Sequence, residues 1–82
     1  MAAMKYREEY RINKKGCEIY RSEIWTEALE TFRRLSEKRP GVYSLQSRDC
    51  RIGKYGVLEV NISTGENAWS PWRDRKINLD RV

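Results

Sequence analysis

The sequence predicts a small α+β domain with the element order ββαββ(β), a two-layer arrangement in which one helix packs on one face of an antiparallel sheet. The first observation behind this prediction is a segment whose apolar residues recur at the spacing of one helical face, with charged residues between them. These residues are Trp25, Ala28, Leu29, Phe32 and Leu35. The second observation is that the runs on both sides of this segment have the alternation and the flanking turn residues that are typical of strands.

The 82 residues are the length of one small domain, so we expect a single unit over residues 1–82. We expect residues 1–4 and about 74–82 to be flexible, because both ends are mostly polar or lack a strand or helix pattern.

Two strands are expected before the helix. Over residues 5–12, tyrosine and isoleucine alternate with charged residues, which indicates a half-buried strand. Residues 13–16, Asn-Lys-Lys-Gly, form a favourable turn because Asn begins turns and Gly accepts a positive φ. Residues 17–22 then return as a second strand, and together the two strands form a hairpin.

The helix is expected to begin near Thr26 as N-cap, with Ser22 as an earlier alternative start, and to end before Pro40. Glutamates occupy its first turns and basic residues its last turn, which suits the helix dipole. Glu30 and Arg34 are also spaced as a favourable i,i+4 ion pair. Pro40 stops the helix because the residue before a proline avoids the helical region.

Three further strands are expected after the helix. Residues 42–51 form the third strand, a glycine-containing turn covers residues 52–56, and residues 57–62 form the fourth strand with alternating apolar side chains. A short fifth strand at residues 68–69 would end at Pro71, which cannot donate a backbone hydrogen bond.

This arrangement predicts which residues form the core and which face stays in water. The predicted core consists of Ile12, Ile19, Trp25, Leu29, Phe32, Leu35, Leu45, Leu58, Val60 and Ile62. The opposite face of the sheet carries charged residues and is expected to be solvated. These are Arg7, Glu9, Arg11, Glu18 and Glu59.

The residue types argue against an enzyme. The chain has no histidine, no glycine-rich nucleotide motif and only two distant cysteines. Glu8 and Glu9 are adjacent on a strand and point to opposite faces, so they cannot work as a pair. We therefore expect no catalytic residues, no cofactor and no metal site.

The net charge of +5 originates in one stretch of the chain. Residues 1–32 hold six basic and six acidic side chains and residues 55–82 hold four of each, so residues 33–54 carry the surplus. Such a surplus suits a phosphate-binding surface, an acidic protein partner, or a dipole-matched helix end followed by solvated strand arginines, and strand geometry allows two separate patches. The candidates for nucleic-acid binding are Arg33, Arg34, Lys38, Arg39, Arg48, Arg51 and Lys54.

A second candidate surface is the segment around two tryptophans that flank a proline and lead into basic residues. Tryptophan and arginine are the residue types most common at interface hot spots. The structural alternative is that the tryptophans close the open end of a small core. The candidates for a protein interface are Trp69, Trp72, Arg73, Arg75 and Lys76.

The sequence therefore favours a non-catalytic binding module that docks on another protein as a regulator or inhibitor, with a homodimer as one form it could take. Sheet-edge pairing through the first or fifth strand is one route for docking. The alternative is a nucleic-acid-binding module that uses residues 33–54 against phosphate, and a third option is a structural subunit of a larger assembly. We expect a cytoplasmic protein, because the sequence shows neither a secretory signal nor a membrane-spanning run.

Overall fold

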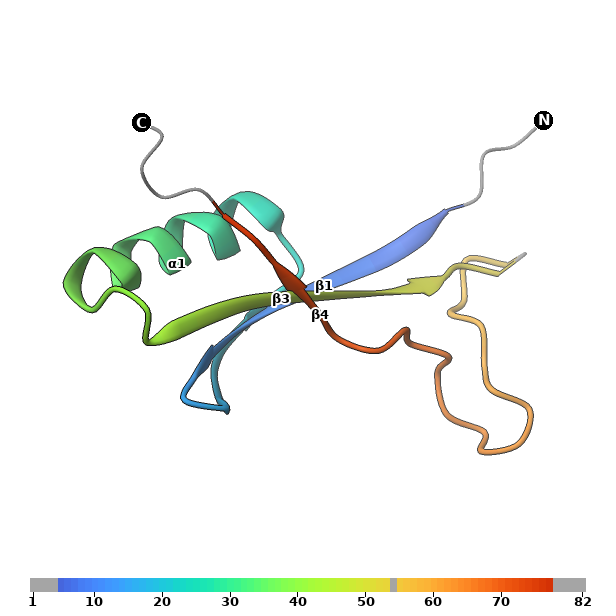
Figure 1. Ribbon diagram of the computed structural model, residues 1–82. Coiled ribbons are helices and arrows are strands. Elements are labelled where there is room, and N and C mark those ends of the chain that lie inside the picture. The colour runs from blue at the N-terminus through green and yellow to red at the C-terminus, as the bar shows by residue number, and fades with distance from the viewer. Residues whose placement is uncertain (1–4, 54, 78–82) are drawn as a thin grey trace.

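The structure is a computed structural model that describes residues 5–53 and 55–77. Four strands form one open antiparallel sheet in the order β2-β1-β3-β4, and one helix covers part of one face (Figure 1). The predicted fold class is confirmed. The elements are β1 (Tyr6–Lys14), β2 (Cys17–Ser22), α1 (Trp25–Lys38), β3 (Tyr43–Arg51) and β4 (Arg73–Arg75).

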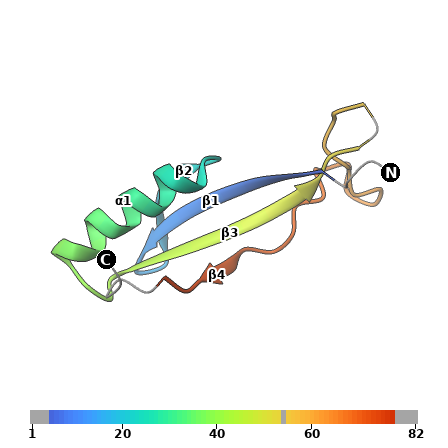
Figure 2. The same cartoon turned by 90° about the horizontal axis from the view of Figure 1, so that it is seen from above.

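The pairing of β1 with β3 is the longest in the sheet and forms its centre. The two strands are in register over nine pairs, from Tyr6 opposite Arg51 to Lys14 opposite Tyr43. Figure 2 shows them side by side along the molecule, with β2 and β4 on the two outer sides. β1 is therefore an inner strand and not a sheet edge, so the proposed docking route through an edge formed by the first strand was wrong.

The β1–β2 hairpin is tighter than the sequence indicated. β1 continues through Lys14, so the turn contains only Lys15 and Gly16, which have φ values of 50° and 83°. Two-residue turns with positive φ match the twist of the strands that they join. The register then shifts between Ile12 and Asn13, which leaves Ile19 without a partner. Ile19 is consequently 48% exposed, and its assignment to the core was wrong.

The helix begins at Trp25 with Ile24 as its N-cap residue, so the assignment of Thr26 as N-cap was wrong. The hydroxyl of Ser22 accepts the backbone N–H of Ile24 at 3.0 Å, and this local turn leads the chain into the helix. The helix ends at Lys38, ahead of Pro40 as predicted, and the N–H of Arg39 caps it on the carbonyl of Leu35.

The main core lies between α1 and the sheet, at the β2 side. Ile12, Phe32 and Leu45 are buried there as predicted, and Trp25, Leu29 and Leu35 pack around them partly buried. The predicted core left out several members of this core, including the alanine that the helical pattern had placed on the apolar face. The missed members are Tyr10, Tyr20, Ala28, Tyr43 and Ile77.

The predicted strand at residues 57–62 is wrong. Only single bridges form there, Ile52 with Leu58 and Val60 with Asn67. The side-chain oxygen of Asn61 accepts the N–H of Ser63 at 3.0 Å, which starts a turn inside the expected strand. As a result Val60 is 48% exposed and Ile62 is fully exposed, while Leu58 is half-buried outside the main core, so all three core assignments were wrong.

The last strand also lies elsewhere than predicted. Residues 68–69 are not a strand, and β4 forms only after Pro71, where the chain can again donate to β3. Asp74 and Arg75, the first residues of the segment expected to be flexible, belong to β4. Residues 1–4 and 78–82, also expected to be flexible, lie outside the described residues.

The bulge that exposes Ile19 gives a matched test of the core. We expect Ile12→Val to lower the free energy of unfolding by about 1 kcal/mol, because Ile12 is completely buried. Ile19→Val, the same change at a half-exposed position, is expected to stay within about 0.5 kcal/mol. Urea unfolding measures both, and equal losses at the two positions would contradict the observed register.

The raised pKa of the Tyr10 phenol predicts that the free energy of unfolding falls at high pH. Burial raises the pKa of Tyr10 to about 12, and the carboxylate of Glu8, which accepts the phenol hydrogen bond, adds to the shift. The unfolded phenol ionises near pH 10. Tyr10 therefore contributes stability below about pH 10, and this contribution is lost as the pH rises toward 12.

The measurement is urea unfolding at a series of pH values from 8 to 11.5. Tyr10→Phe should make the fall above about pH 10 shallower. Tyr55→Phe, which removes a phenol that is 88% exposed, is the matched control and should leave the fall in place. Identical profiles for the wild type and Tyr10→Phe would show that the buried phenol does not cause the fall.

Candidate functional site

The two tryptophans of the C-terminal segment lie on the sheet face opposite the helix. Strand alternation places Trp72 on the same face as Asp74, while Arg73 and Arg75 point to the helix side. The guanidinium of Arg11 lies 4.2 Å from the centre of the Trp72 ring, and that of Arg48 lies 4.5 Å from both tryptophan rings. The tryptophans therefore close the face opposite the helix and not the helix-side core.

We call Arg11, Arg21, Arg48, Trp69 and Trp72 the arginine–tryptophan face. Arg21 completes it, with its guanidinium 5.4 Å from the centre of the Trp72 ring. The sequence predicted that charged residues on this face would be solvated, which is wrong for Arg11 in β1, because Trp72 covers it and it is half-buried. The sequence analysis did not predict the pairing of β4 with β3, and this pairing brings the tryptophans over the sheet.

The three arginines of this face share two carboxylates, those of Glu9 and Glu18. Arg48 binds Glu9, its direct partner across the β1–β3 ladder, at 2.6 Å and 2.8 Å. Arg21 donates to Glu18 at 2.7 Å, and this hydrogen bond is the main reason why the pKa of Glu18 is lowered and that of Arg21 is raised. Arg11 lies 3.8 Å from Glu18. Paired in this way, the arginines hold the C-terminal segment on the sheet and leave a surplus of one positive charge, three arginines less two glutamates.

The rest of the predicted protein-interface residues are spread along β4. Arg73 donates to Asp49 at 2.9 Å, and the guanidinium of Arg75 lies 5.1 Å from the centre of the Trp25 ring. Lys76, the next residue, is exposed. The segment that looked like one interface is therefore divided between two faces of the sheet.

The predicted nucleic-acid residues are divided as well. Four of them are exposed on α1 or directly after it, and Arg34 in this group pairs with Glu30 at 2.9 Å. These four are Arg33, Arg34, Lys38 and Arg39.

The other three lie away from the helix. Arg48 is half-buried under the tryptophans, on the opposite side of the sheet. Arg51 lies at the far end of β3, with its Nε 3.6 Å from Glu59. Lys54 lies outside the described residues. The basic segment 33–54 therefore does not form one surface.

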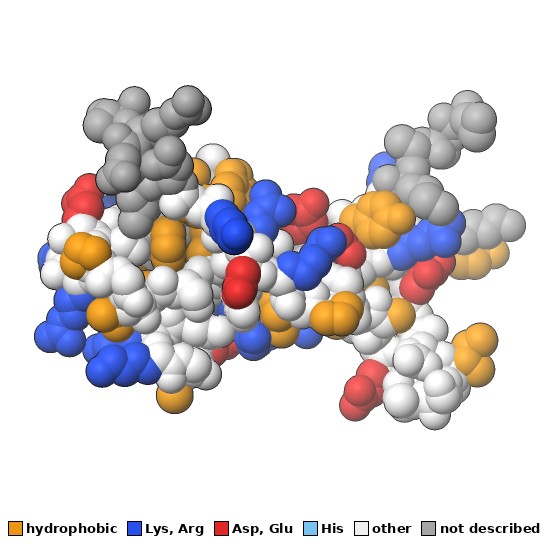
Figure 3. Space-filling view, in the orientation of Figure 1, with side chains coloured by type: hydrophobic (Ala, Val, Ile, Leu, Met, Phe, Trp, Pro, Cys, Tyr) orange, Lys and Arg blue, Asp and Glu red, His pale blue; other side chains and the backbone are white. Residues whose placement is uncertain are grey.

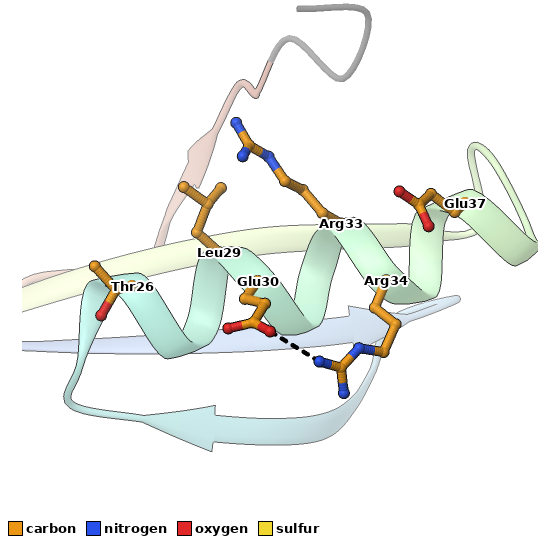
Figure 4. Close-up of a pocket in the computed structure, with 6 residues that line it drawn as sticks. All are labelled: Thr26, Leu29, Glu30, Arg33, Arg34 and Glu37. Carbon is orange, nitrogen blue, oxygen red and sulfur yellow. Dashed lines mark hydrogen bonds and ion pairs between the residues drawn. The ribbon is translucent and has the colours of Figure 1, made fainter. Parts of the chain in front are cut away.

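A groove lies along the outer flank of α1 and encloses about 360 Å³. Figure 4 shows Leu29 and Arg33 pointing to the same side, while Glu30 and Arg34 are joined by an ion pair. The groove is lined by two glutamates and two arginines around one leucine and one threonine, so its lining favours neither an anionic nor a cationic ligand. Within residues 5–53 and 55–77, no three cysteine or carboxylate side chains gather as a metal site would require.

The least expected feature is a set of large apolar side chains in water. We call residues 55–68 the apolar arm, a segment that extends beyond the far end of β3 (Figure 1). Three of its side chains are strongly exposed, Tyr55 at 88%, Val57 at 65% and Ile62 fully, and Val60 is half-exposed at 48%. Orange side chains accordingly appear at this end of the molecule in Figure 3. The sequence reading missed this surface because it placed the same residues in a buried strand.

The backbone of the apolar arm is hydrogen-bonded although most of its large apolar side chains are exposed. The N–H of Glu59 donates to Arg51 at 2.9 Å, and the N–H of Ala68 donates to Glu59 at 2.8 Å. Near the tip of the arm, the N–H of Asn61 donates to Glu66 at 2.7 Å. The arm is therefore a shaped projection that presents apolar side chains, fixed at its base to the end of β3.

Comparisons of the chain with protein-family models, curated proteins and solved structures find no match. Among the described residues, no helix is both long and apolar enough to cross a membrane. The candidate surfaces therefore rest on their own geometry and chemistry.

The stacking of Arg11 on Trp72 can be measured by a double-mutant cycle. We expect Arg11→Met and Trp72→Leu to be less destabilising together than the sum of the single changes, with a coupling of about 0.5–1 kcal/mol. Thermal or urea unfolding of the four proteins supplies the cycle. The same cycle with Arg33→Met is the control, since no contact joins Arg33 to Trp72 in the described structure. Additive losses for the Arg11 cycle would contradict the stacking.

Proposed function

We propose that this protein is a non-catalytic binding module that docks on another protein through its apolar arm, as a regulator or inhibitor of that protein. The observation that supports the proposal is the exposure of Tyr55, Val57, Val60 and Ile62 on one short projection. Single exposed apolar residues are normal, but four of them lie within eight consecutive positions of this projection, and such a concentration suits an interaction site.

The charge of the apolar arm favours a protein partner over a nucleic acid. Residues 55–68 contain no lysine or arginine and two glutamates, Glu59 and Glu66. Phosphate would be repelled by this segment, whereas the apolar centre of a protein interface is depleted in charge and enriched in aromatic residues. The exposed ring of Tyr55 is the strongest single anchor on this surface.

The conformation of the arm suits docking better than the open edges of the sheet do. The outer strand β2 carries the bulge at Ile19, and such irregularities discourage pairing with a further strand. The other outer strand, β4, has only three residues. In the arm, the exposed side chains rather than a free backbone edge are available to a partner, because the backbone of Val57 and Glu59 is already hydrogen-bonded within the chain.

We place the module in the cytoplasm. Cys17 is exposed and Cys50 is buried, and both are free thiols on strands that are not neighbours in the sheet. Free thiols, one of them exposed, suit a reducing compartment.

The proposal predicts that partner binding depends on the arm. We expect Val57→Ser combined with Ile62→Ser to abolish capture of the partner while leaving the fold intact, because both side chains are already exposed. The matched control is Ile19→Ser with Ile24→Ser, which changes two half-exposed isoleucines on another part of the surface. Affinity purification from nuclease-treated lysate, followed by mass spectrometry, measures the capture.

The expected result is a protein retained by the wild type and by the control but absent with the arm variant. Unchanged capture by the arm variant would contradict the proposal, as would the loss of every partner after nuclease treatment.

A further inference from the structure

The structure brings together two pairs of basic residues that are far apart in the sequence. The backbone N–H of Lys15 in the β1–β2 turn donates to the carbonyl of Val42 at 3.4 Å, and Lys14 pairs with Tyr43. The hairpin turn is therefore adjacent to the loop that follows the C-terminus of α1, where Lys38 is located. Blue side chains gather at this end of the molecule in Figure 3. We call Lys14, Lys15, Lys38 and Arg39 the basic tip.

The residues of the basic tip are close enough to act on one ligand. Arg39 is three residues from Val42, so their Cα atoms are at most about 11 Å apart. Strand alternation places Lys14 on the face of the sheet that the helix covers, which is the side of Lys38. Lys15, Lys38 and Arg39 are exposed, and Lys14 is half-buried.

The charge of the basic tip is not neutralised within the described chain. Every arginine of the arginine–tryptophan face has a carboxylate partner, but no described carboxylate forms an ion pair with any of the four tip residues. In the two segments that carry the tip, residues 14–17 and 37–42, Glu37 is the only acidic residue. The tip therefore has a surplus of three positive charges, four basic residues less one acidic residue.

The helix dipole does not account for this surplus. The C-terminus of a helix carries about half a negative charge, which one lysine in the last turn is enough to balance. Lys38 occupies that last turn. The remaining cations, two of them supplied by another element, repel one another in the free protein and would be stabilised by an anionic ligand.

We propose that the basic tip binds the phosphate backbone of a nucleic acid without reading its sequence. Lysine is depleted in protein–protein interfaces, and no strongly exposed large apolar side chain of the described residues belongs to the tip, which argues against a protein partner. The same lack of an apolar anchor argues against a membrane surface, since interfacial binding usually combines charge with apolar insertion. Long flexible lysines on a projecting turn suit a row of phosphates.

The proposal makes the salt dependence quantitative. Four cations that each neutralise one duplex phosphate give a log–log slope near −3.6, so affinity should fall by about 150-fold between 50 and 200 mM salt. Replacing three of the four should reduce the slope to near −0.9.

The experiment is a fluorescence anisotropy titration of a labelled duplex oligonucleotide with the full chain, at several salt concentrations. The tip variant combines Lys15→Gln, Lys38→Gln and Arg39→Gln. The control combines Lys5→Gln, Arg7→Gln and Arg51→Gln, which removes the same charge at the opposite end of the β1–β3 ladder. Two duplexes of unrelated sequence test the absence of base readout. Circular dichroism verifies that both variants are folded.

We expect the control to keep a slope near −3.6 and the tip variant to lose at least ten-fold in affinity at about 50 mM salt, with equal binding of the two duplexes. Equal losses in the two variants would overturn the proposal, because net charge alone would then explain the binding. Binding to anionic phospholipid vesicles but not to the duplex would also overturn it, as would no binding at low salt. The arm variant Val57→Ser with Ile62→Ser should bind the duplex normally, so the two proposals can fail separately.

Discussion

The pairing of β1 with β3 is the constraint on which the rest of the structure depends. Its nine residue pairs create a central ribbon whose two faces need cover, and no other pairing in the sheet is as long. The helix covers one face at the β2 end with apolar side chains around Ile12 and Leu45. The other face is covered by tryptophan rings on paired arginines, so the two faces are protected by different chemistry.

The same ribbon separates the two candidate binding surfaces. The basic tip is at the end where β1 finishes and β3 begins, and the apolar arm starts from the other end of β3. A nine-residue strand is about 27 Å long, which is well beyond the screening length at physiological salt. If both proposals hold, the two surfaces are far enough apart to act independently, and a protein partner at one end would leave the other end free for phosphate.

Local patterns predicted the helix, the first hairpin and β3 because each is encoded within a short run of residues. Several of the failures involve information outside such a run. The bulge at Ile19 depends on how β2 is matched to β1, and the position of β4 depends on a partner strand more than twenty residues away. The basic tip could not be predicted from the charge of residues 33–54, because half of it is supplied by the β1–β2 hairpin, by Lys14 at the end of β1 and Lys15 in the turn. The apolar arm was missed because Asn61 starts a turn in a sequence that otherwise favours a strand.

Native-state hydrogen exchange measured by NMR tests the central claim most directly, namely that the arm is a projection separate from a core built on β1 and β3. The amides of β1 and β3 near Ile12 and Leu45 should exchange only by global unfolding. The amides of Glu59, Asn61 and Ala68 should open locally, at a much smaller free energy, because the arm has few packed side chains. Equal protection of the arm and of the β1–β3 ladder would show that residues 55–68 belong to the core and would contradict the claim.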